Sequence, residues 1–428
     1  SGGETYAYAI ADLDLDGYAD LVLARIYGVR IFPGGPDGMQ PDRWYELPIT
    51  TGYCMQVHVA DLDRDGWLDI VALVQTYDDR PETMADSTRV FWGGPDGYSV
   101  ERSTVLPTYS TGAGYLADLD ADGFVDLALL DRDGVLVIHH GGPDGFPSGR
   151  TTRIPLGTKA WALHLSAADL DGDGWLDVIV GVAGHYARSP ETLIILWGGP
   201  DGFDPERVTR YDAGYSPGQP TVADLGDGAL TLVLPAYSSV ASRELPWELL
   251  RFRGREIDHA ATRRIQGYGS CHILPLDIDG DGWTDLLVSN HRRNEVHDAD
   301  AIIYWGGPDG IREDRTTHLP GWGPHYLTMR DPGNALDRGP AERYVSPPIA
   351  LDGGRVTSVQ VDADVPEGTS LDVEVRVAGS VDALATAAWG PAPAGPGAWL
   401  QYRASFGSRT GARSPRLRSV VVETAPPQ

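Results

Sequence analysis

Residues 61–69 read Asp-Leu-Asp-Arg-Asp-Gly-Trp-Leu-Asp, and four other stretches of the chain share this Asp-x-Asp-x-Asp-Gly-x-x-Asp pattern. The five copies start at Asp12, Asp61, Asp118, Asp169 and Asp277. A shortened copy, Asp-Leu-Gly-Asp-Gly-Ala-Leu-Thr, starts at Asp224 and counts as repeat five of six. Neighbouring starts lie 49 to 57 residues apart, and such a period indicates a repeated supersecondary unit.

The spacing of the aspartates predicts a metal-binding loop in each full copy. Carboxylates at positions 1, 3 and 5 of a tight loop converge on one point, glycine at position 6 permits a sharp turn, and position 7 offers a carbonyl. A ligand set made only of oxygen atoms favours Ca²⁺. A solvated acidic turn without a metal is the alternative for one copy, and five copies in register argue against it.

The residue at position 12 separates this loop from an EF-hand, which has a bidentate glutamate there. Position 12 is apolar in all five full copies: Leu23, Ala72, Leu129, Val180 and Val288. We therefore expect a strand after the loop instead of a helix, with the aspartate at position 9 completing the ligand set.

A second motif, Gly-Gly-Pro-Asp-Gly, occurs once in each of the same five repeats and ends at Gly38, Gly97, Gly145, Gly202 and Gly310. It predicts a β-turn, because proline presets one corner and glycine accepts a left-handed conformation. Each repeat is therefore predicted to contain, in order, strand A, the metal loop, strand B, a connection, strand C, the β-turn and strand D. Four-stranded blades of this kind bury their faces by stacking around an axis, so the expected fold is a β-propeller.

These two motifs resemble the FG-GAP (VCBS-type) repeat of integrin α-subunit propellers and of bacterial and fungal relatives, some of them lectins. The resemblance covers roughly residues 4–320. It implies that repeat five holds no metal and that the other five loops bind about five structural Ca²⁺. The implied ligands are the aspartates at positions 1, 3, 5 and 9: Asp12, Asp14, Asp16, Asp20, Asp61, Asp63, Asp65, Asp69, Asp118, Asp120, Asp122, Asp126, Asp169, Asp171, Asp173, Asp177, Asp277, Asp279, Asp281 and Asp285.

The predicted class is all-β, with a propeller over residues 1–325 and a β-sandwich over residues 326–428. Six blades are recognisable, whereas members of the resembled family usually have seven. A candidate seventh strand A is His325 to Arg330, and residues 344–351 are a further candidate for a seventh blade. In the C-terminal part, four segments alternate as strands do: 356–365, 371–378, 399–406 and 417–423. This part looks like the accessory β-sandwiches of secreted bacterial enzymes and sugar-binding proteins.

Composition narrows the choice of partners. The chain has 61 acidic and 34 basic residues and a formal net charge of −27. Nucleic acids and anionic membranes attract basic surfaces, so neither is expected as a partner. The sequence has no apolar run long enough to insert in a membrane. Calcium loops of this class bind Ca²⁺ outside the cytosol, so we expect a secreted, periplasmic or cell-surface protein. We also expect a monomer.

Two cysteines, Cys54 and Cys271, precede the metal loops of repeats two and six. Three interpretations stay open: small buried residues, a disulfide, or a metal site shared with His58 or His272.

Ligand binding is expected on the face opposite the metal loops. The A–B and C–D connections lie on one face of a propeller, and the D–A and B–C connections lie on the other. Three B–C connections are enlarged, at 75–88, 182–192 and 289–301, and varied loops on a rigid scaffold carry function. The candidate ligand residues are Tyr53, Tyr77, His185, Tyr186, Arg188, His291, Arg292 and Trp322. The alternative is that these are solvated loop residues or rim packing.

Aromatic rings beside arginine and histidine suit a sugar that carries carboxylates or sulfates. The sequence therefore favours a lectin-like binding protein stabilised by calcium. A second interpretation is a carbohydrate-active enzyme such as a polysaccharide lyase, with His185 or Tyr186 as base and Arg188 or Arg292 neutralising a uronate. A third is an adhesin or docking module for a protein partner. No catalytic motif of fixed spacing is present, so no catalytic residue is assigned.

Overall fold

The structure of the protein is a computed structural model. It describes residues 5–14, 16, 18–49, 52–75, 88–106, 108, 113–131, 133–157, 164–182, 192–239, 241–279, 281–293, 296–297, 299–322, 341–346, 348–351, 355–365, 369–384, 386–391, 397–408 and 415–425.

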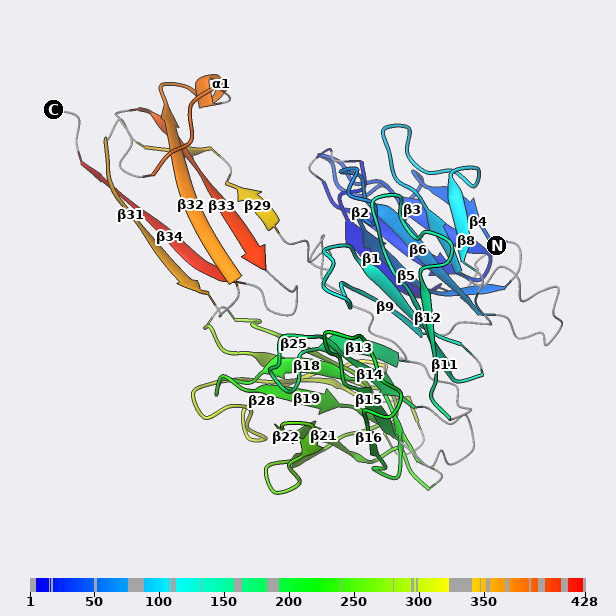
Figure 1. Ribbon diagram of the computed structural model, residues 1–428. Helices are drawn as coiled ribbons and strands as arrows, with labels where there is room; N and C mark the ends of the chain where they lie inside the picture. Colours follow the sequence, from blue (N-terminus) through cyan, green and yellow to red (C-terminus); the bar gives the residue numbers. More distant parts are fainter. Residues whose placement is uncertain are drawn as a thin grey trace. The chain divides into compact units, whose positions relative to one another are not determined.

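Six four-stranded antiparallel sheets follow one another along the first three quarters of the chain (Figure 1). In each sheet the strands are hydrogen-bonded in chain order, as predicted for blades. The first three sheets consist of β1 (Thr5–Ala11), β2 (Asp20–Arg25), β3 (Gly28–Phe32) and β4 (Tyr45–Pro48); β5 (Tyr53–Ala60), β6 (Asp69–Gln75), β7 (Thr88–Phe91) and β8 (Ser103–Leu106); and β9 (Ala113–Ala117), β10 (Asp126–Leu130), β11 (Val135–His139) and β12 (Thr151–Pro155).

The next three sheets repeat the pattern. They consist of β13 (His164–Ala168), β14 (Asp177–Gly181), β15 (Leu193–Leu196) and β16 (Val208–Tyr211); β18 (Thr221–Asp224), β19 (Leu230–Leu234), β21 (Pro246–Leu250) and β24 (Arg263–Gln266); and β25 (Ser270–Leu276), β26 (Asp285–Asn290), β27 (Ala301–Tyr304) and β28 (Thr316–Leu319). Repeat five also carries two short pairs: β17 (Ser216–Pro217) with β20 (Ala236–Ser238), and β22 (Phe252–Arg253) with β23 (Glu256–Ile257).

The second strand of blade two shows why the blades stack, because its buried side chains alternate between two cores. Every residue of β6 is buried. Ile70 and Ala72 pack in a core shared with sheet one, whereas Val71 and Leu73 pack in a core shared with sheet three. Successive side chains of a strand point to opposite faces, so a strand that is apolar at every position holds a neighbour on each side.

Shared cores also join sheet four to five and sheet five to six. Between sheets three and four, β9 contacts β13, and Arg210 donates through Nη2 to the carbonyl of Leu156 at 2.7 Å. The prediction of an all-β propeller built from four-stranded blades is confirmed.

The C-terminal strands form a separate pair of sheets. In one sheet, β29 (Ala341–Val345), β30 (Ile349–Ala350) and β32 (Thr369–Ala378) pair with β33 (Trp399–Ser408). In the other, β31 (Arg355–Asp364) pairs with β34 (Arg416–Ala425). Leu351, Val356, Val375 and Leu400 form a core between them, which is the arrangement of a small β-sandwich. The single helix among the described residues, α1 (Val381–Leu384), is one turn long.

The chain divides into two compact units, and the change from the first to the second falls between Asp337 and Arg338. The predicted boundary at 325/326 and the candidate strand His325 to Arg330 lie outside the described residues. Residues 344–351, the other candidate for a seventh blade, contribute to β29 and β30 and pair with β33 in the C-terminal unit.

A fragment of residues 338–428 is expected to fold without the propeller, because its strands pair with one another and its two sheets share their own core. The measurement is a thermal melt followed by circular dichroism, in which the fragment should show a β spectrum and a cooperative transition. A fragment with a random-coil spectrum would mean that this unit depends on the propeller for folding.

Candidate cation loops and ligand-binding face

The predicted metal ligands converge in the structure. Carboxylate oxygens lie within 4.8 Å of one another in three-residue groups of four loops. These groups are Asp12, Asp14 and Asp20; Asp61, Asp63 and Asp69; Asp118, Asp120 and Asp122; and Asp169, Asp171 and Asp177. In repeat six, the Asp281 amide donates to Asp277 Oδ1 and Asp279 Oδ1, as the Asp16 amide does to Asp12 and Asp14 in repeat one.

Each loop is folded by its own carboxylates. The aspartate at position 5 accepts the amide of position 7 at 2.8 to 3.0 Å in repeats one, two, four and six. The glycine at position 6 has φ of 94° at Gly66 and 97° at Gly174, which is the left-handed region that the sharp turn requires.

The aspartate at position 9 joins the two sequence motifs. Its Oδ2 accepts the amide of loop position 2 at 2.8 to 3.0 Å, and its Oδ1 accepts the amide of the first glycine in Gly-Gly-Pro-Asp-Gly at 2.6 to 2.9 Å. All five of these side chains are buried: Asp20, Asp69, Asp126, Asp177 and Asp285. This carboxylate therefore clamps the A–B loop to the C–D turn, a role that the spacing of the motif alone does not reveal.

The same contact explains the first glycine of the turn motif. A Cβ atom there would lie 2.1 to 2.4 Å from the carbonyl oxygen of loop position 8 in all five repeats. The last glycine has φ of 71° to 80°, and its amide donates to the carbonyl of the second glycine at 2.8 to 2.9 Å. The predicted β-turn is confirmed.

The electrostatics of the loops fit a divalent cation. Burial raises the pKa of Asp69 and Asp177 to about 7, although backbone hydrogen bonds act in the opposite direction. Positive charge nearby would favour the ionised form of these carboxylates. In the loop of repeat two, Asp61 Oδ1 is buried and has no hydrogen-bond partner in the structure, which leaves this oxygen available for a cation.

Repeat five places an arginine beside its shortened loop. Thr231 occupies position 9 there, and the position that precedes Gly-Gly in other repeats is Arg251. Arg251 forms an ion pair with Asp227 and donates to the carbonyl of Ala229 at 3.0 Å. This arrangement supports the expectation that repeat five holds no metal, which stays a prediction.

Chelation with EGTA at low salt should lower the melting temperature of the propeller. A site occupied at about 100 times its Kd contributes about 2.7 kcal/mol, which corresponds to roughly 5 °C per site in a domain of this size. Differential scanning calorimetry measures the shift. A transition that EGTA does not move would mean that cations contribute little to stability.

The cation-free protein should also lose stability as pH rises. Asp69 and Asp177 have a pKa of about 7 in the folded state against an ordinary value of 3.8, so the folded state binds more protons between these limits. Stability in EGTA should therefore fall from pH 5 to pH 8. Saturating Ca²⁺ should remove this dependence, because the cation favours the ionised carboxylates. An EGTA melt with no pH dependence would contradict the burial argument.

The structure places half of the predicted ligand residues. Tyr77, His185, Tyr186 and Arg188 lie outside the described residues. Trp322 is 88% exposed. Tyr53 is half-buried, and its ring stacks on that of Tyr27 at a centroid distance of 6.5 Å.

His291 and Arg292 are adjacent but differ in exposure: His291 is buried, with 3% of its surface exposed, and Arg292 is half-buried. His291 therefore packs beneath the surface. The exposed ring of His297 covers it, with 4.4 Å between the two ring centroids. Arg292 donates through Nε to His297 Nε2 at 3.1 Å.

Arg292 and His297 belong to a cluster that we call the aromatic–arginine patch: Tyr237, Arg243, Tyr268, Arg292, Arg293 and His297. Arg243 stacks on Tyr237 at 4.4 Å, and Arg293 stacks on Tyr268 at 4.6 Å. The patch gathers the B–C connections of repeats five and six and the D–A connection between them. Backbone hydrogen bonds fix it, from the Arg292 amide to the Tyr268 carbonyl and from the His291 amide to the Gly269 carbonyl.

Both cysteines are buried and free, so the disulfide interpretation is wrong. Burial raises the pKa of each thiol to about 12, as expected for small residues in a core.

The family model of the FG-GAP-like repeat matches residues 12–72 and 118–180. Human integrin alpha-7 is 31% identical over 145 residues, which are 31% of this chain and 12% of the integrin. Rat integrin alpha-7 is 28% identical over 255 residues, which are 56% of this chain and 21% of the integrin. The chain thus spans less than a quarter of the length of these relatives.

Among solved structures, an Agrocybe aegerita lectin described as recognising non-reducing terminal N-acetylglucosamine aligns with a TM-score of 0.45 and 14% identity, over 73% of this chain and 79% of the lectin. A complex of BBS1N with ARL6DN aligns with a TM-score of 0.46 and 11% identity, over 75% of this chain and 82% of the other. Within the described residues, no helix is long and apolar enough to span a membrane. The matched residues hold the loops of repeats one to four described above, so these repeats are FG-GAP-like and the β-propeller is similar to that of integrin α-subunits.

Proposed function

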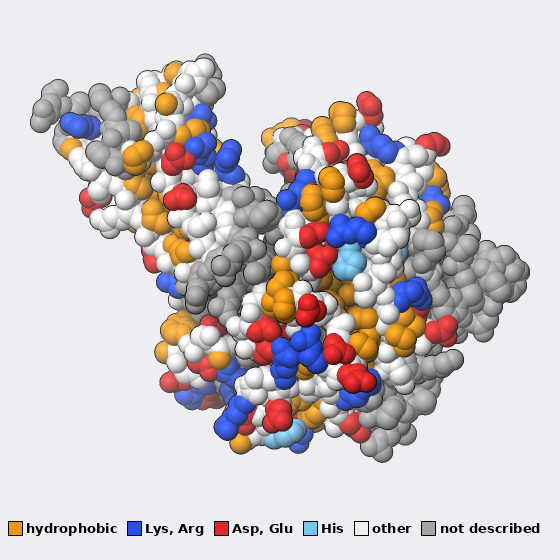
Figure 2. Space-filling view, in the orientation of Figure 1, with side chains coloured by type: hydrophobic (Ala, Val, Ile, Leu, Met, Phe, Trp, Pro, Cys, Tyr) orange, Lys and Arg blue, Asp and Glu red, His pale blue; other side chains and the backbone are white. Residues whose placement is uncertain are grey.

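We propose that this FG-GAP-type propeller is a binding protein that recognises an extracellular ligand, with Ca²⁺ in its loops as a structural ion and a carbohydrate as its ligand. The integrin-like repeats support a recognition role and an extracellular setting. The protein would act as a secreted, periplasmic or cell-surface monomer, without nucleic acid as a partner. Figure 2 shows acidic and basic side chains interspersed on the face in view, with no basic stripe of the kind that phosphate backbones require.

In this proposal the cation loops have a structural role and the opposite face binds the ligand. The aspartates at positions 1, 3, 5 and 9 would hold Ca²⁺, and the position 9 carboxylate also fixes the C–D turn through its backbone contacts. A bound ion would supply positive charge to the loop carboxylates and so stabilise the blades. None of these residues belongs to the aromatic–arginine patch, so the loops serve as scaffold and the patch serves recognition.

The observation that carries the proposal is the aromatic–arginine patch. Exposed or half-buried rings, here Tyr237 and Tyr268, offer stacking surfaces for the C–H face of a sugar. Arg292 and Arg293 supply planar donors that pair with carboxylates or sulfates in two-point contacts. The patch therefore favours an anionic glycan, such as one that carries uronates or sulfates.

A glycan array run with the full chain tests this proposal. The variant Arg292→Ala/Arg293→Ala should lose at least tenfold in affinity for the glycan that binds. The matched control is Arg312→Ala, an exposed arginine after the C–D turn of repeat six, which should bind within twofold of the wild type. The pair Tyr186→Ala/Arg188→Ala tests the enlarged loop of repeat four in the same way.

Normal binding by both double variants, with loss in Arg312→Ala, would move the site to the loop face. An increase in absorbance at 235 nm with an anionic polysaccharide would instead support the lyase interpretation. Binding to a protein and to no glycan would support the docking interpretation.

A further inference from the structure

The residue that precedes Gly-Gly in the turn motif lies beside the metal loop of its own repeat. In repeats two, four and six this residue is a tryptophan: Trp92, Trp197 and Trp305. Each donates through Nε1 at 2.9 Å to a threonine twelve residues later, Thr104, Thr209 or Thr317. The indole nitrogen thus faces strand D and presents no polar atom to the loop.

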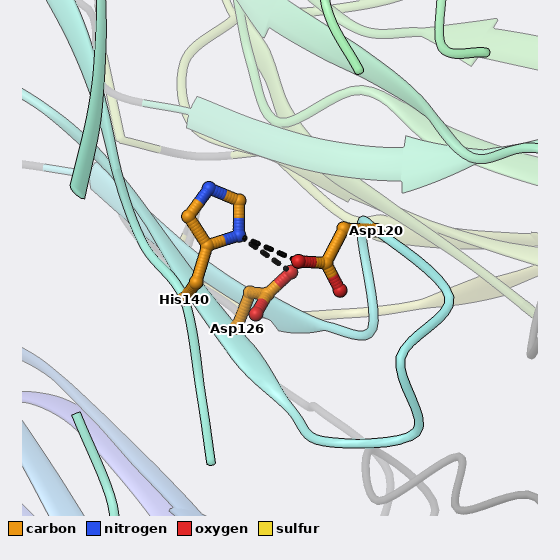
Figure 3. A group of neighbouring side chains, drawn as sticks. All are labelled: Asp120, Asp126 and His140. Atoms are coloured by element: carbon orange, nitrogen blue, oxygen red, sulfur yellow. Dashed lines mark ion pairs between the residues drawn. The ribbon is translucent and has the colours of Figure 1, made fainter. Parts of the chain in front are cut away.

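In repeat three the same position holds His140. Its Nε2 lies 3.0 Å from Thr152 Oγ1, which is the contact that tryptophan makes in the other repeats. The ring is therefore held in the same way, but its second nitrogen faces the loop. His140 Nδ1 is buried and lies 3.1 Å from Asp120 Oδ2 and 3.5 Å from Asp126 Oδ2 (Figure 3).

These three groups have the geometry of a mixed nitrogen and oxygen site. Their ligand atoms lie within 4.8 Å of one another, and Asp118 and Asp122 cluster with Asp120 in the same loop. A histidine that donates through one nitrogen to a fixed acceptor presents the lone pair of the other nitrogen, as metal-ligating histidines do. When His140 Nε2–H donates to the Thr152 hydroxyl, the neutral ring presents Nδ1 to the loop as a ligand.

Nitrogen in the ligand set changes which cation the loop prefers. Ca²⁺ takes oxygen ligands, whereas imidazole suits later first-row transition metals such as Ni²⁺ and Zn²⁺, and Co²⁺ stands beside them in the same affinity series. We infer that the loop of repeat three, completed by His140 Nδ1, binds a transition-metal dication in preference to Ca²⁺. This inference rests on the proposal that the loops hold divalent cations.

The alternative is that protonated His140 takes the place of the cation, the role expected of Arg251 in repeat five. Charge argues against it. Repeat five has lost the aspartates of positions 3 and 9, whereas repeat three keeps all four, at Asp118, Asp120, Asp122 and Asp126. Arg150, whose Nη2 lies 3.4 Å from Asp120, and an imidazolium would supply two positive charges beside these four carboxylates.

The test uses the full chain without a histidine tag, stripped with EDTA and dialysed against micromolar Co²⁺ in millimolar Ca²⁺. Metal content is measured by mass spectrometry, and nitrogen ligation by the cobalt absorption spectrum. Wild type should retain one equivalent of Co²⁺. The variant His140→Trp places the tryptophan of repeats two, four and six in repeat three. It should retain less than a tenth of that Co²⁺, and its Ca²⁺ content should not fall. Trp92→His should gain a second equivalent of Co²⁺, which keeps the inference testable if His140→Trp fails to fold.

Equal Co²⁺ retention by wild type and His140→Trp would overturn the inference, and so would Ca²⁺ in all five loops of wild type with no Co²⁺. These outcomes leave the proposed function standing. A wild-type protein that holds neither ion in any loop would overturn the cation premise of the proposed function and this inference with it.

Discussion

Replacing Asp69 with alanine should lower the free energy of unfolding of the propeller by about 3 kcal/mol or more, with or without cation. The side chain is buried and accepts the amides of Leu62 and Gly93, both at 2.8 Å. Alanine leaves two buried N–H groups without acceptors, at about 1–3 kcal/mol each. The loss should appear in urea unfolding in EGTA, because it concerns the clamp between loop and turn and not the ion.

Asp65→Ala is the matched control in the same loop. Asp65 is exposed, and its Oδ1 accepts the amide of Trp67 in its own turn at 2.8 Å. In EGTA this variant should lose about 1 kcal/mol or less, and in Ca²⁺ it should lose the contribution of the ion in repeat two. If the two variants lost equal stability, and only when Ca²⁺ is present, Asp69 would be a ligand and nothing more.

The blades could be predicted from sequence because two motifs of fixed internal spacing mark both hairpins in five of the six units. Position 9 was predictable as an aspartate near a metal, but its role as a clamp was not. Its partner glycine follows at different distances, 14 residues on from Asp20 and 24 on from Asp69, because the B–C connection varies in length. The partner is also a backbone amide, which no side-chain pattern reveals.

A spacing that is visible in the sequence could have revealed one further contact. Trp92, His140, Trp197 and Trp305 each have a threonine twelve residues later, and all four pairs touch in the structure. Aligning the repeats on Gly-Gly-Pro-Asp-Gly would have shown His140 as the exception beside a metal loop.

The ligand-binding face was harder to predict because its side chains come from connections that follow no repeat. His291 and Arg292 were equal candidates in sequence, and the end of β26 decides that the first is buried. Tyr237 and Arg243 were missed because the metal motif of repeat five is degenerate, so its B–C connection, residues 235–245, was not recognised as an enlarged one. The Tyr237 ring and the Arg243 guanidinium come close to the patch residues of repeat six because blades five and six stack on each other.

The second large effect is expected at Gly34, and its neighbour Gly35 provides the control. A Cβ on Gly34 would lie 2.4 Å from the carbonyl oxygen of Ala19, whereas nothing lies within 4 Å of a Cβ on Gly35. Gly34→Ala therefore forces loop and turn apart and stretches the 2.6 Å hydrogen bond from the Gly34 amide to Asp20. Overpacking of this kind costs about 1–3 kcal/mol, and the strained hydrogen bond adds about 1 kcal/mol or more.

Gly35→Ala should change stability by less than about 0.5 kcal/mol, because Gly35 is not among the glycines with positive φ and the added methyl group meets no atom. Urea unfolding of both variants gives the comparison, and Ca²⁺ titration by calorimetry shows whether the loop of repeat one still forms. Equal stability of the two variants would mean that the turn can move away from the loop without cost. The clamp at position 9 would then be a consequence of blade packing, and the cation in each loop would hold the hairpins together on its own.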